Sequence, residues 1–359
     1  MKECTVIPFG PQHPVLPEPL HFDLVLKDET IVDAIPQIGY IHRGLELLVE
    51  KREYQDYVFV AERICGICSF MHGMGYCMAV EDMMKISVPD RALYLRTLWS
   101  ELSRIHSHLL WLGLGADAFG FENLFMACWR SRELILDLIE STTGGRVIFG
   151  SCMVGGVRRD VDDAAFAQII SVLDSMKKEL QTMTDIFLND VSVRHRLVGV
   201  GILSKKDAYE LGAVGPMLRA SGVALDTRKR GYAAYGELDF KVITEGSGDC
   251  HARAAVRIHE IYQSIDLIRQ VARQIAPGDL FVKPVGLPSG EAFARVEQPR
   301  GEAVYFVRGN GTKFLERFRV RTPTFANVPP MIKVMKGSTL ADVPNLVLTI
   351  DPCISCTER

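Results

Sequence analysis

The sequence predicts a mainly α-helical protein with small antiparallel β regions at both ends. Three observations lead to this prediction. Apolar residues recur at helical spacing through most of residues 45–276. Apolar and polar residues alternate, with turn signals between them, in residues 1–40 and again in residues 290–359. We therefore expect an α+β protein in which a helix bundle lies between two β regions.

The N-terminal β region is predicted to contain a hairpin. Residues 20–26 and 29–35 alternate like two strands, with Lys27 and Asp28 near the turn. Residues 10–14, Gly-Pro-Gln-His-Pro, predict a rigid loop, because proline interrupts both a helix and a central strand.

The central region is predicted to be helical, with ends marked by glycine and proline. Pro89 separates two helices, and Thr142-Thr143-Gly144-Gly145 ends another. Asp162 and Asp163 suit the start of a helix, where negative charge is favourable. The predicted helices cover residues 54–61, 71–84, 92–112, 124–140, 161–189 and 250–275.

The C-terminal region returns to strand patterns. Residues 292–297 and 302–308 alternate, and Asn310-Gly311 is a strong hairpin signal before a return strand over residues 312–320. A short helix is expected over residues 327–335, followed by an apolar run, 346–350, that brings the last residues to the core. No clear boundary divides the chain, so we expect residues 1–359 to form a single interlocked domain.

The bulk composition excludes several classes of protein. The 359 residues carry a net charge of −3, which argues against a basic face for nucleic acid. No run of about twenty apolar residues occurs, so we expect no direct membrane span. Nine cysteines, an odd number, in a sequence without a signal peptide indicate a reducing compartment.

Two Cys-x-x-Cys pairs, Cys65/Cys68 and Cys353/Cys356, are separated by nearly the whole sequence. Two such pairs can place four thiolates on zinc, on an iron–sulfur cluster, or on nickel with iron. A structural zinc site usually draws its pairs from one small module, with about 15–20 residues between them. The wide separation here favours a catalytic redox metal over structural zinc.

The residues around the cysteines carry a family resemblance. Arg63-Ile64-Cys65-Gly66-Ile67-Cys68 with His72, and Asp351-Pro352-Cys353 with Cys356 and Arg359, resemble the large, catalytic subunit of nickel–iron hydrogenases. Other segments resemble the group 4, energy-converting (Ech-type) branch, which is related to the 49 kDa quinone-site subunit of respiratory complex I. These are residues 10–14, 39–46, 215–222 and 299–301. The resemblance covers nearly the whole chain and implies a hydrogenase large-subunit fold around the helix bundle.

The resemblance implies a nickel–iron centre. Cys65, Cys68, Cys353 and Cys356 would bind nickel as thiolates, and Cys68 and Cys356 would also bridge to an iron that carries two cyanides and one carbon monoxide. His72 would donate a hydrogen bond to a cysteine sulfur. Alternatively, His72 is a core histidine satisfied by a backbone carbonyl.

Further site residues are implied by matching segments. Arg300, after Pro299, matches the arginine that lies over the metals, although a surface salt bridge is the alternative. Thr324 matches a hydrogen-bond donor to cyanide. Asp351 would lie beside the metals or cap the turn. Glu18 matches the glutamate that takes protons from a cysteine bound to nickel alone. The alternative is that Glu18 is an ordinary loop carboxylate.

Glu46 matches a carboxylate that binds a magnesium or iron ion in many hydrogenases. That site normally also uses a histidine three residues after the last cysteine, and Arg359 occupies this position here. An Arg359–Glu46 ion pair is therefore the alternative to Mg²⁺.

The resemblance implies the catalytic subunit of a membrane-associated, ferredoxin-linked hydrogenase that interconverts dihydrogen with protons and electrons. Expected partners are an iron–sulfur small subunit with 4Fe–4S clusters and membrane-integral subunits that couple the reaction to ion translocation. The chain would be a peripheral subunit on the cytoplasmic side of the cell membrane. Three alternatives stay open: the hydrogenase module of a formate hydrogenlyase-type complex, a complex I-type quinone-site subunit without nickel, and a non-enzymatic, zinc-stabilised scaffold.

Overall fold

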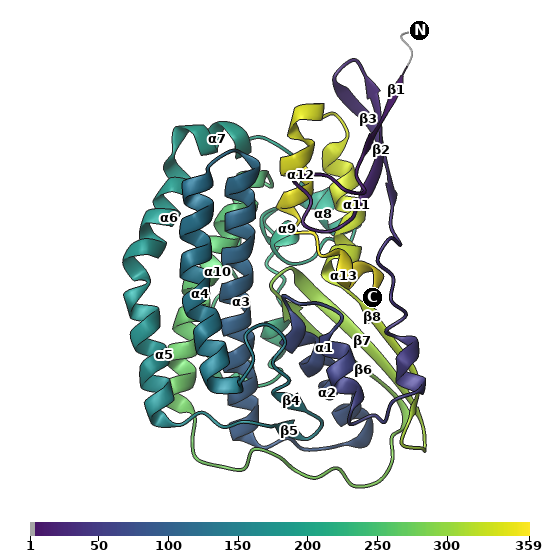
Figure 1. The fold of residues 1–359 in the computed structure, drawn as a ribbon, viewed down its shortest axis with the longest axis vertical. Coiled ribbons are helices and arrows are strands. Elements are labelled where there is room, and N and C mark those ends of the chain that lie inside the picture. Colours follow the sequence, from purple (N-terminus) through teal and green to yellow (C-terminus); the bar gives the residue numbers. More distant parts are fainter. Residues whose placement is uncertain (1–3) are drawn as a thin grey trace.

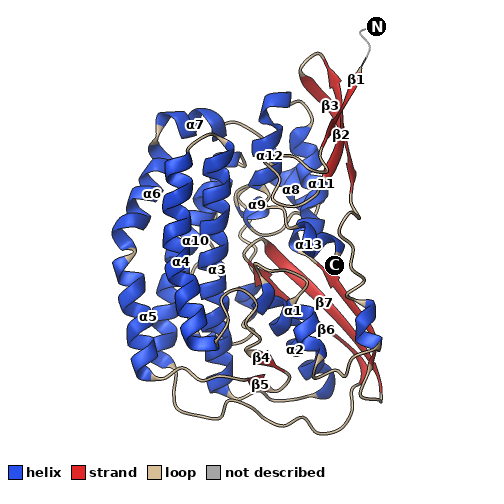
Figure 2. Cartoon of the chain, viewed as in Figure 1, coloured by secondary structure: helices blue, strands red, loops and turns tan. Residues whose placement is uncertain are grey.

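The computed structural model describes residues 4–359, so residues 1–3 of the predicted N-terminal β region lie outside it. The prediction of a mainly helical protein with antiparallel sheets toward both ends is confirmed (Figures 1 and 2). The α-helices are α1 (Tyr57–Glu62), α2 (Ser69–Met84), α3 (Asp90–Ala118), α4 (Glu122–Thr143), α5 (Asp163–Ser175), α6 (Lys177–Asn189), α7 (Val191–Leu197), α8 (Lys205–Glu210), α9 (Pro216–Arg219), α10 (Cys250–Gln274), α11 (Pro323–Met335), α12 (Val343–Thr349) and α13 (Ile354–Glu358). The 3-10 helices are η1 (Leu47–Glu50), η2 (Thr227–Arg230), η3 (Tyr235–Glu237) and η4 (Leu340–Asp342).

The bundle is built from α3, α4, α5, α6 and α10 (Figure 1). Helix α3 packs against both α4 and α10 and is buried along most of its length, which explains its central place. Within residues 4–359, no helix combines the length and the hydropathy required to cross a membrane.

In the part of the chain that the structure describes, three antiparallel sheets complete the fold. The strands are β1 (Thr5–Phe9), β2 (His21–Lys27), β3 (Thr30–Gln37), β4 (Cys152–Met153), β5 (Gly156–Val157), β6 (Ser289–Gln298), β7 (Gly301–Asn310) and β8 (Leu315–Arg321). The order is β1-β2-β3 in the first sheet, β4-β5 in the second and β6-β7-β8 in the third. The first sheet extends from the body of the molecule at the N-terminal end (Figure 1).

The third sheet supports the helices that carry the first cysteine pair. Alternate residues of β7, including Ala303, Tyr305 and Val307, are buried, as the period of a half-covered strand requires. Helix α2 packs on β6 and β7, so the segment after Cys68 is fixed against this sheet. Helices α11, α12 and α13 follow the sheet in sequence: α11 contacts β3 and β7, α12 packs against α3, α10 and α11, and α13 packs against α11.

Several predicted boundaries were wrong. The single helix expected over residues 161–189 is two helices, α5 and α6, separated by the one residue Met176, which keeps right-handed helical backbone angles. There the Ser175 hydroxyl donates to the Val172 carbonyl, a local bond that competes with regular helix geometry. The return strand expected from residue 312 begins at Leu315, since Thr312 bonds to the Asn310 side chain in the turn.

Other elements began elsewhere or were not predicted. The short helix expected from residue 327 begins at Pro323, which is suited to the first helical turn. The helix expected from residue 54 begins at Tyr57. Strand β1 was not predicted. It contains Pro8, and it lies at the edge of its sheet, where proline is tolerated.

Candidate metal centre

The two cysteine pairs meet at the starts of two helices. Cys65 lies in the turn between α1 and α2, and Cys68 immediately precedes α2. Cys353 immediately precedes α13, and Cys356 lies within it. The backbone N–H groups of Ile67 and Cys68 point at the Cys65 sulfur, at 3.2 and 3.4 Å. Such donors favour a thiolate, as does the positive end of the α2 dipole.

The four sulfurs form one buried cluster. Cys65 Sγ lies 3.3 Å from Cys353 Sγ, and Cys68 Sγ lies 3.7 Å from Cys356 Sγ. The sulfurs of Cys65, Cys68 and Cys356 all lie within 4.8 Å of one another. Each of the four residues is at most 3% exposed. The structure therefore joins residues from opposite parts of the sequence at one point.

The cluster fits a bound metal ion. Thiolates about 2.3 Å from one metal in a tetrahedron lie about 3.8 Å apart, which is close to the Cys68–Cys356 distance of 3.7 Å, whereas Cys65 and Cys353 lie closer together at 3.3 Å. The other thiols donate to Cys65 and hold its pKa well below the usual range. Burial and the neighbouring sulfurs hold the pKa values of Cys68 and Cys356 well above theirs. Without a cation the cluster favours one thiolate, and binding as four thiolates would need a cation to balance their charge.

A cavity of about 410 Å³ opens onto this cluster. One part of its wall is apolar, and the other part is polar or carries sulfur. The apolar part contains Leu110, Trp111, Leu114, Trp129 and Leu348. The remaining part includes Glu18, Cys65, Arg300, Asp351, Cys353 and Ser355. The predicted residues Glu18, Arg300 and Asp351 are thus brought together with one cysteine of each pair.

Arg300 and Asp351 form a buried ion pair in this wall. Arg300 Nη2 donates to Asp351 Oδ1 at 2.7 Å, Nε donates to the Asp351 carbonyl at 2.8 Å, and Nη1 donates to Ser107 Oγ at 3.2 Å. Arg300 is therefore no surface arginine. The second carboxylate oxygen of Asp351 is buried and has no partner, and Asp351 has a positive φ of 58°. Strained backbone and unpaired polar atoms of this kind concentrate at functional sites.

Glu18 reaches the cluster from the loop between β1 and β2. Its carboxylate accepts from the backbone N–H of Ile354 and, at 3.2 Å, from that of Ser355, and it also bonds the Ser355 hydroxyl. It therefore caps the first turn of α13 directly beside Cys353, while still lining the cavity.

Thr324 and Pro299 lie close to the same elements. The backbone N–H of Cys353 donates to Thr324 Oγ1 at 3.1 Å, which leaves the hydroxyl hydrogen of Thr324 free to donate. Nearby in sequence, the buried hydroxyl of Thr322 has no partner. Pro299 is buried in the turn from β6 to β7 and leads directly to Arg300.

His72 lies in the first turn of α2, with Nε2 3.3 Å from Cys356 Sγ. The contact with a cysteine sulfur that the sequence suggested is present. His72 Nε2 faces this sulfur and does not bond a backbone carbonyl, which was the alternative. Burial lowers the pKa of His72 to about 4, so the ring is neutral near pH 7. Sequence reasoning missed two residues here, Gln298 and Tyr305, which contact His72 from β6 and β7. Two features of the sequence could have indicated them. Gln298 directly precedes Pro299, and Tyr305 occupies a position in its strand whose side chain faces the interior.

Glu46 forms the ion pair expected as the alternative to a metal. Arg359 Nε donates to Glu46 Oε1 at 2.8 Å, the Val320 N–H donates to the same oxygen at 2.9 Å, and Arg319 pairs with the other oxygen. Burial favours the neutral form, yet these donors outweigh it and hold the Glu46 pKa below its usual range. Both carboxylate oxygens are therefore already compensated by cationic side chains.

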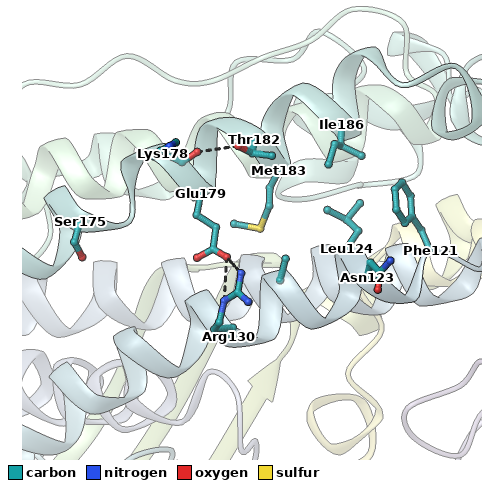
Figure 3. Close-up of a pocket in the computed structure, with 11 residues that line it drawn as sticks. Phe121, Asn123, Leu124, Arg130, Ser175, Lys178, Glu179, Thr182, Met183 and Ile186 are labelled. Carbon is teal, nitrogen blue, oxygen red and sulfur yellow. Dashed lines mark hydrogen bonds and ion pairs between the residues drawn. The ribbon is translucent and has the colours of Figure 1, made fainter.

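A second groove, of about 520 Å³, lies between α4 and α6 (Figure 3). Its walls carry apolar residues such as Leu124 and Met183, and the Arg130–Glu179 ion pair crosses it. None of the predicted site residues lines this groove, so we assign the candidate site to the cysteine cluster.

Comparison with protein families gives two matches. A model described as the respiratory-chain NADH dehydrogenase 49 Kd subunit matches residues 118–285 and 279–359. A model described as nickel-dependent hydrogenase matches residues 43–113, the segment that contains Cys65, Cys68 and His72.

Individual relatives align along nearly the whole chain. The membrane-bound hydrogenase subunit alpha of Pyrococcus furiosus is 38% identical, over 98% of this chain and 87% of its own length. The carbon monoxide-induced hydrogenase of Rhodospirillum rubrum is also 38% identical, over 98% of this chain and 99% of its own. Among solved structures, a chain of the membrane-bound sulfane sulfur reductase, an archaeal respiratory membrane complex, superposes with a TM-score of 0.95 at 32% identity. That match covers 100% of this chain and 99% of the other.

Proposed function

Because the chain belongs to the family that joins nickel-dependent hydrogenases with the 49 Kd subunit of respiratory-chain NADH dehydrogenase, we propose that it is the catalytic subunit of a membrane-associated, energy-converting [NiFe] hydrogenase. The reaction is the reversible interconversion of dihydrogen with protons and electrons. The observation that carries this proposal is the buried cluster of four cysteine sulfurs beside a cavity.

The four thiols are the residues that would hold the centre. Cys65, Cys68, Cys353 and Cys356 would hold nickel in this proposal, and Cys68 and Cys356 would also hold an iron that carries cyanide and carbon monoxide. When bound, the nickel–iron centre supplies the cleavage of dihydrogen and accepts its electrons. Thr324 would be able to donate its hydroxyl hydrogen to a cyanide, and the turn at Pro299 fixes Arg300 in the cavity wall. We place no magnesium at Glu46, because two arginines already compensate its carboxylate.

Glu18 and the Arg300–Asp351 pair have distinct roles in the cavity. Glu18 accepts a proton from Cys353 and passes it outward, since its carboxylate lies beside α13 and lines the same cavity. Arg300 holds a fixed positive charge in that wall, and Asp351 keeps its guanidinium in place.

Electrons leave through partner subunits in this proposal. The cysteine site is the one group of three or more metal-binding side chains found in residues 4–359. A small subunit with 4Fe–4S clusters would therefore carry the electrons to or from ferredoxin, and membrane-integral subunits would couple this transfer to ion movement. The chain would be a peripheral subunit on the cytoplasmic side of the membrane.

A second candidate is a subunit of a related respiratory complex that binds no nickel and reduces a quinone or a sulfur compound. The match to the 49 Kd subunit and the similarity to the sulfane sulfur reductase favour it. The four converging cysteines favour the hydrogenase, because quinone binding has no chemical need for four buried thiols at one point. A formate hydrogenlyase-type module would differ only in its electron donor.

Metal analysis of the purified complex tests the proposal. We expect nickel in a 1:1 ratio to this chain, extra iron, and infrared bands from cyanide and carbon monoxide. Serine at Cys65, Cys68, Cys353 or Cys356 should abolish nickel retention and hydrogen oxidation, because each substitution removes a soft ligand.

Cys250→Ser is the matched control. Cys250 is equally buried but lies near Thr349 and Arg253, outside the cluster, so this variant should keep its nickel. Stoichiometric zinc without nickel in the wild-type complex, or no metal at all, would disprove the proposal and favour the second candidate.

A further inference from the structure

Tyr305 contacts the histidine of the metal centre from behind. It is fully buried on β7, and its hydroxyl oxygen lies 2.9 Å from His72 Nδ1 and 2.9 Å from Gln298 Nε2. The other nearby acceptor, the carbonyl of Met71, is more distant at 3.5 Å. The shortest contacts of this hydroxyl are therefore with one histidine and one glutamine.

The hydrogen-bond capacities of these groups set a direction. A tyrosine hydroxyl has one hydrogen to donate, and an amide nitrogen only donates. Gln298 Nε2 therefore donates to the Tyr305 oxygen, and Tyr305 donates its hydrogen to His72 Nδ1 as the nearest acceptor. With Nδ1 accepting, the single hydrogen of the neutral ring lies on Nε2.

The hydrogen on Nε2 has one acceptor within reach. Both Cys356 Sγ and Gln298 Nε2 lie 3.3 Å from His72 Nε2, and only the sulfur can accept. The result is an ordered chain of donors from Gln298 through Tyr305 and His72 to Cys356.

We propose that Tyr305 and Gln298 are positioning residues that fix the tautomer of His72, so that His72 always donates its Nε2 hydrogen to the Cys356 thiolate. A thiolate that accepts this hydrogen bond carries less charge toward its metal and is held in one orientation. Partners of metal ligands act in this way in many metal sites.

The packing of α2 on β7 supports this assignment. A Cβ atom built on Gly75 would lie 2.3 Å from Cε2 of the Tyr305 ring. Only glycine at this position of α2 lets the ring approach the helix that carries His72. Glycine at this position thus permits the close approach that brings the Tyr305 hydroxyl to His72.

The identity of the metal in this inference rests on the proposed function. The hydrogen bond from His72 to the Cys356 thiolate does not. The test is therefore the rate at which the purified complex loses its bound metal to a chelator, a measurement that applies to nickel or zinc alike. Tyr305→Phe should lose metal about 10–100-fold faster than wild type, the usual cost of removing such a partner. If the metal is nickel with iron, the carbon monoxide band should also shift.

Tyr76→Phe is the matched control. Tyr76 is a fully buried tyrosine on α2, and its hydroxyl donates to the Tyr54 carbonyl at 2.7 Å, away from His72. It should lose metal at the wild-type rate. Equal rates in Tyr305→Phe and Tyr76→Phe would overturn the inference, whichever metal the wild type contains.

Gln298→Met provides a second variant if Tyr305→Phe fails to assemble. It removes the donor to Tyr305 and leaves both aromatic rings in place, although it also removes the weaker contact, at 3.5 Å, between Cys68 Sγ and Gln298 Oε1. Faster metal loss in this variant supports the assignment, and a wild-type rate overturns it. Zinc without nickel in the wild type would disprove the proposed function alone, since the comparison of rates would still hold.

Discussion

Glu18 caps α13 and lines the cavity with the same carboxylate. Dihydrogen cleavage would leave a proton near Cys353 in a buried region, and a carboxylate next to that cysteine can remove it. Glutamine has nearly the same shape and can still accept from the backbone N–H of Ser355, but it does not take up and release protons near neutral pH.

We therefore expect Glu18→Gln to keep its nickel and infrared bands while hydrogen oxidation falls by roughly 10²–10⁴-fold, the usual contribution of a positioned acid–base group. Hydrogen isotope exchange with solvent should fall with it, because exchange needs proton movement but no electron acceptor. Both rates are measured on the purified complex.

The control for Glu18 is Glu358→Gln. Glu358 also accepts from two backbone N–H groups, those of Gly39 and Ile41, but it does not line the cavity. This variant should exchange at nearly the wild-type rate. Wild-type exchange in Glu18→Gln would instead show that protons leave by another route and that Glu18 is only a helix cap.

Individual site residues could be predicted from the sequence where they belong to a recognisable motif. Cys65, Cys353, Arg300 and Glu18 all border one cavity, although nothing local in the sequence connects them. Tyr305 was not predicted as a site residue, because its role depends on a contact between α2 and β7. Strand alternation predicts only that its side chain points inward, and not what it touches.

At the scale of elements, α13 depends on contacts from distant segments. A helix of five residues is not stable by itself, because too few hydrogen bonds offset the cost of its first turn. Glu18 caps its start, loop residues 39–43 bond Glu358 and Ser355, and Glu46 pairs with Arg359 after it. No propensity or periodicity could have predicted α13, whereas α3 and α10 followed from apolar spacing alone.

We expect Glu46→Gln to loosen this segment. The substitution removes the negative charge that accepts from Arg359, and a hydrogen bond to a charged group is worth about 1.5–3 kcal/mol, while the pair with the half-exposed Arg319 adds little. Amide hydrogen exchange of residues 354–358 should become roughly 10–100-fold faster, while exchange in α3 stays unchanged. Exchange measured by mass spectrometry on the intact complex resolves the two regions.

Glu53→Gln is the control for this element, since the Lys313–Glu53 pair is solvent-exposed and such pairs contribute little. Adding a magnesium chelator to the wild type should not change exchange at residues 354–358. Faster exchange with chelator would mean that a metal ion, and not the Arg359 pair, holds Glu46 in place.

At the scale of the whole molecule, the helical bundle and the two β regions followed from the sequence because their signals are local. The helix break at Met176, strand β1 and the short helices did not, because side-chain bonds and tertiary packing decide them. The convergence of the two cysteine pairs could be expected from ligand chemistry and from the family resemblance of the motifs around them, but not from any local structural signal. Four thiols far apart in sequence make sense together when one metal binds them.

The proposed function also makes a prediction for the molecule as a part of a complex. The described residues hold one cluster of metal-binding side chains and no helix suited to cross a membrane. If the cluster exchanges electrons with ferredoxin and the reaction moves ions, other subunits must supply the iron–sulfur clusters and the membrane path. We therefore expect the chain to copurify with an iron–sulfur subunit and with membrane-integral proteins.

Native gels of membranes solubilised in mild detergent test this expectation. Hydrogen-dependent dye reduction should stain a single large band, and mass spectrometry of that band should find this chain together with its partners. Washing intact membranes with alkaline carbonate should release the chain without detergent and without activity, because a peripheral subunit leaves its electron-transfer partners behind. An active band that contains this chain alone would contradict the prediction, since electrons would then leave the cysteine site without a partner's clusters.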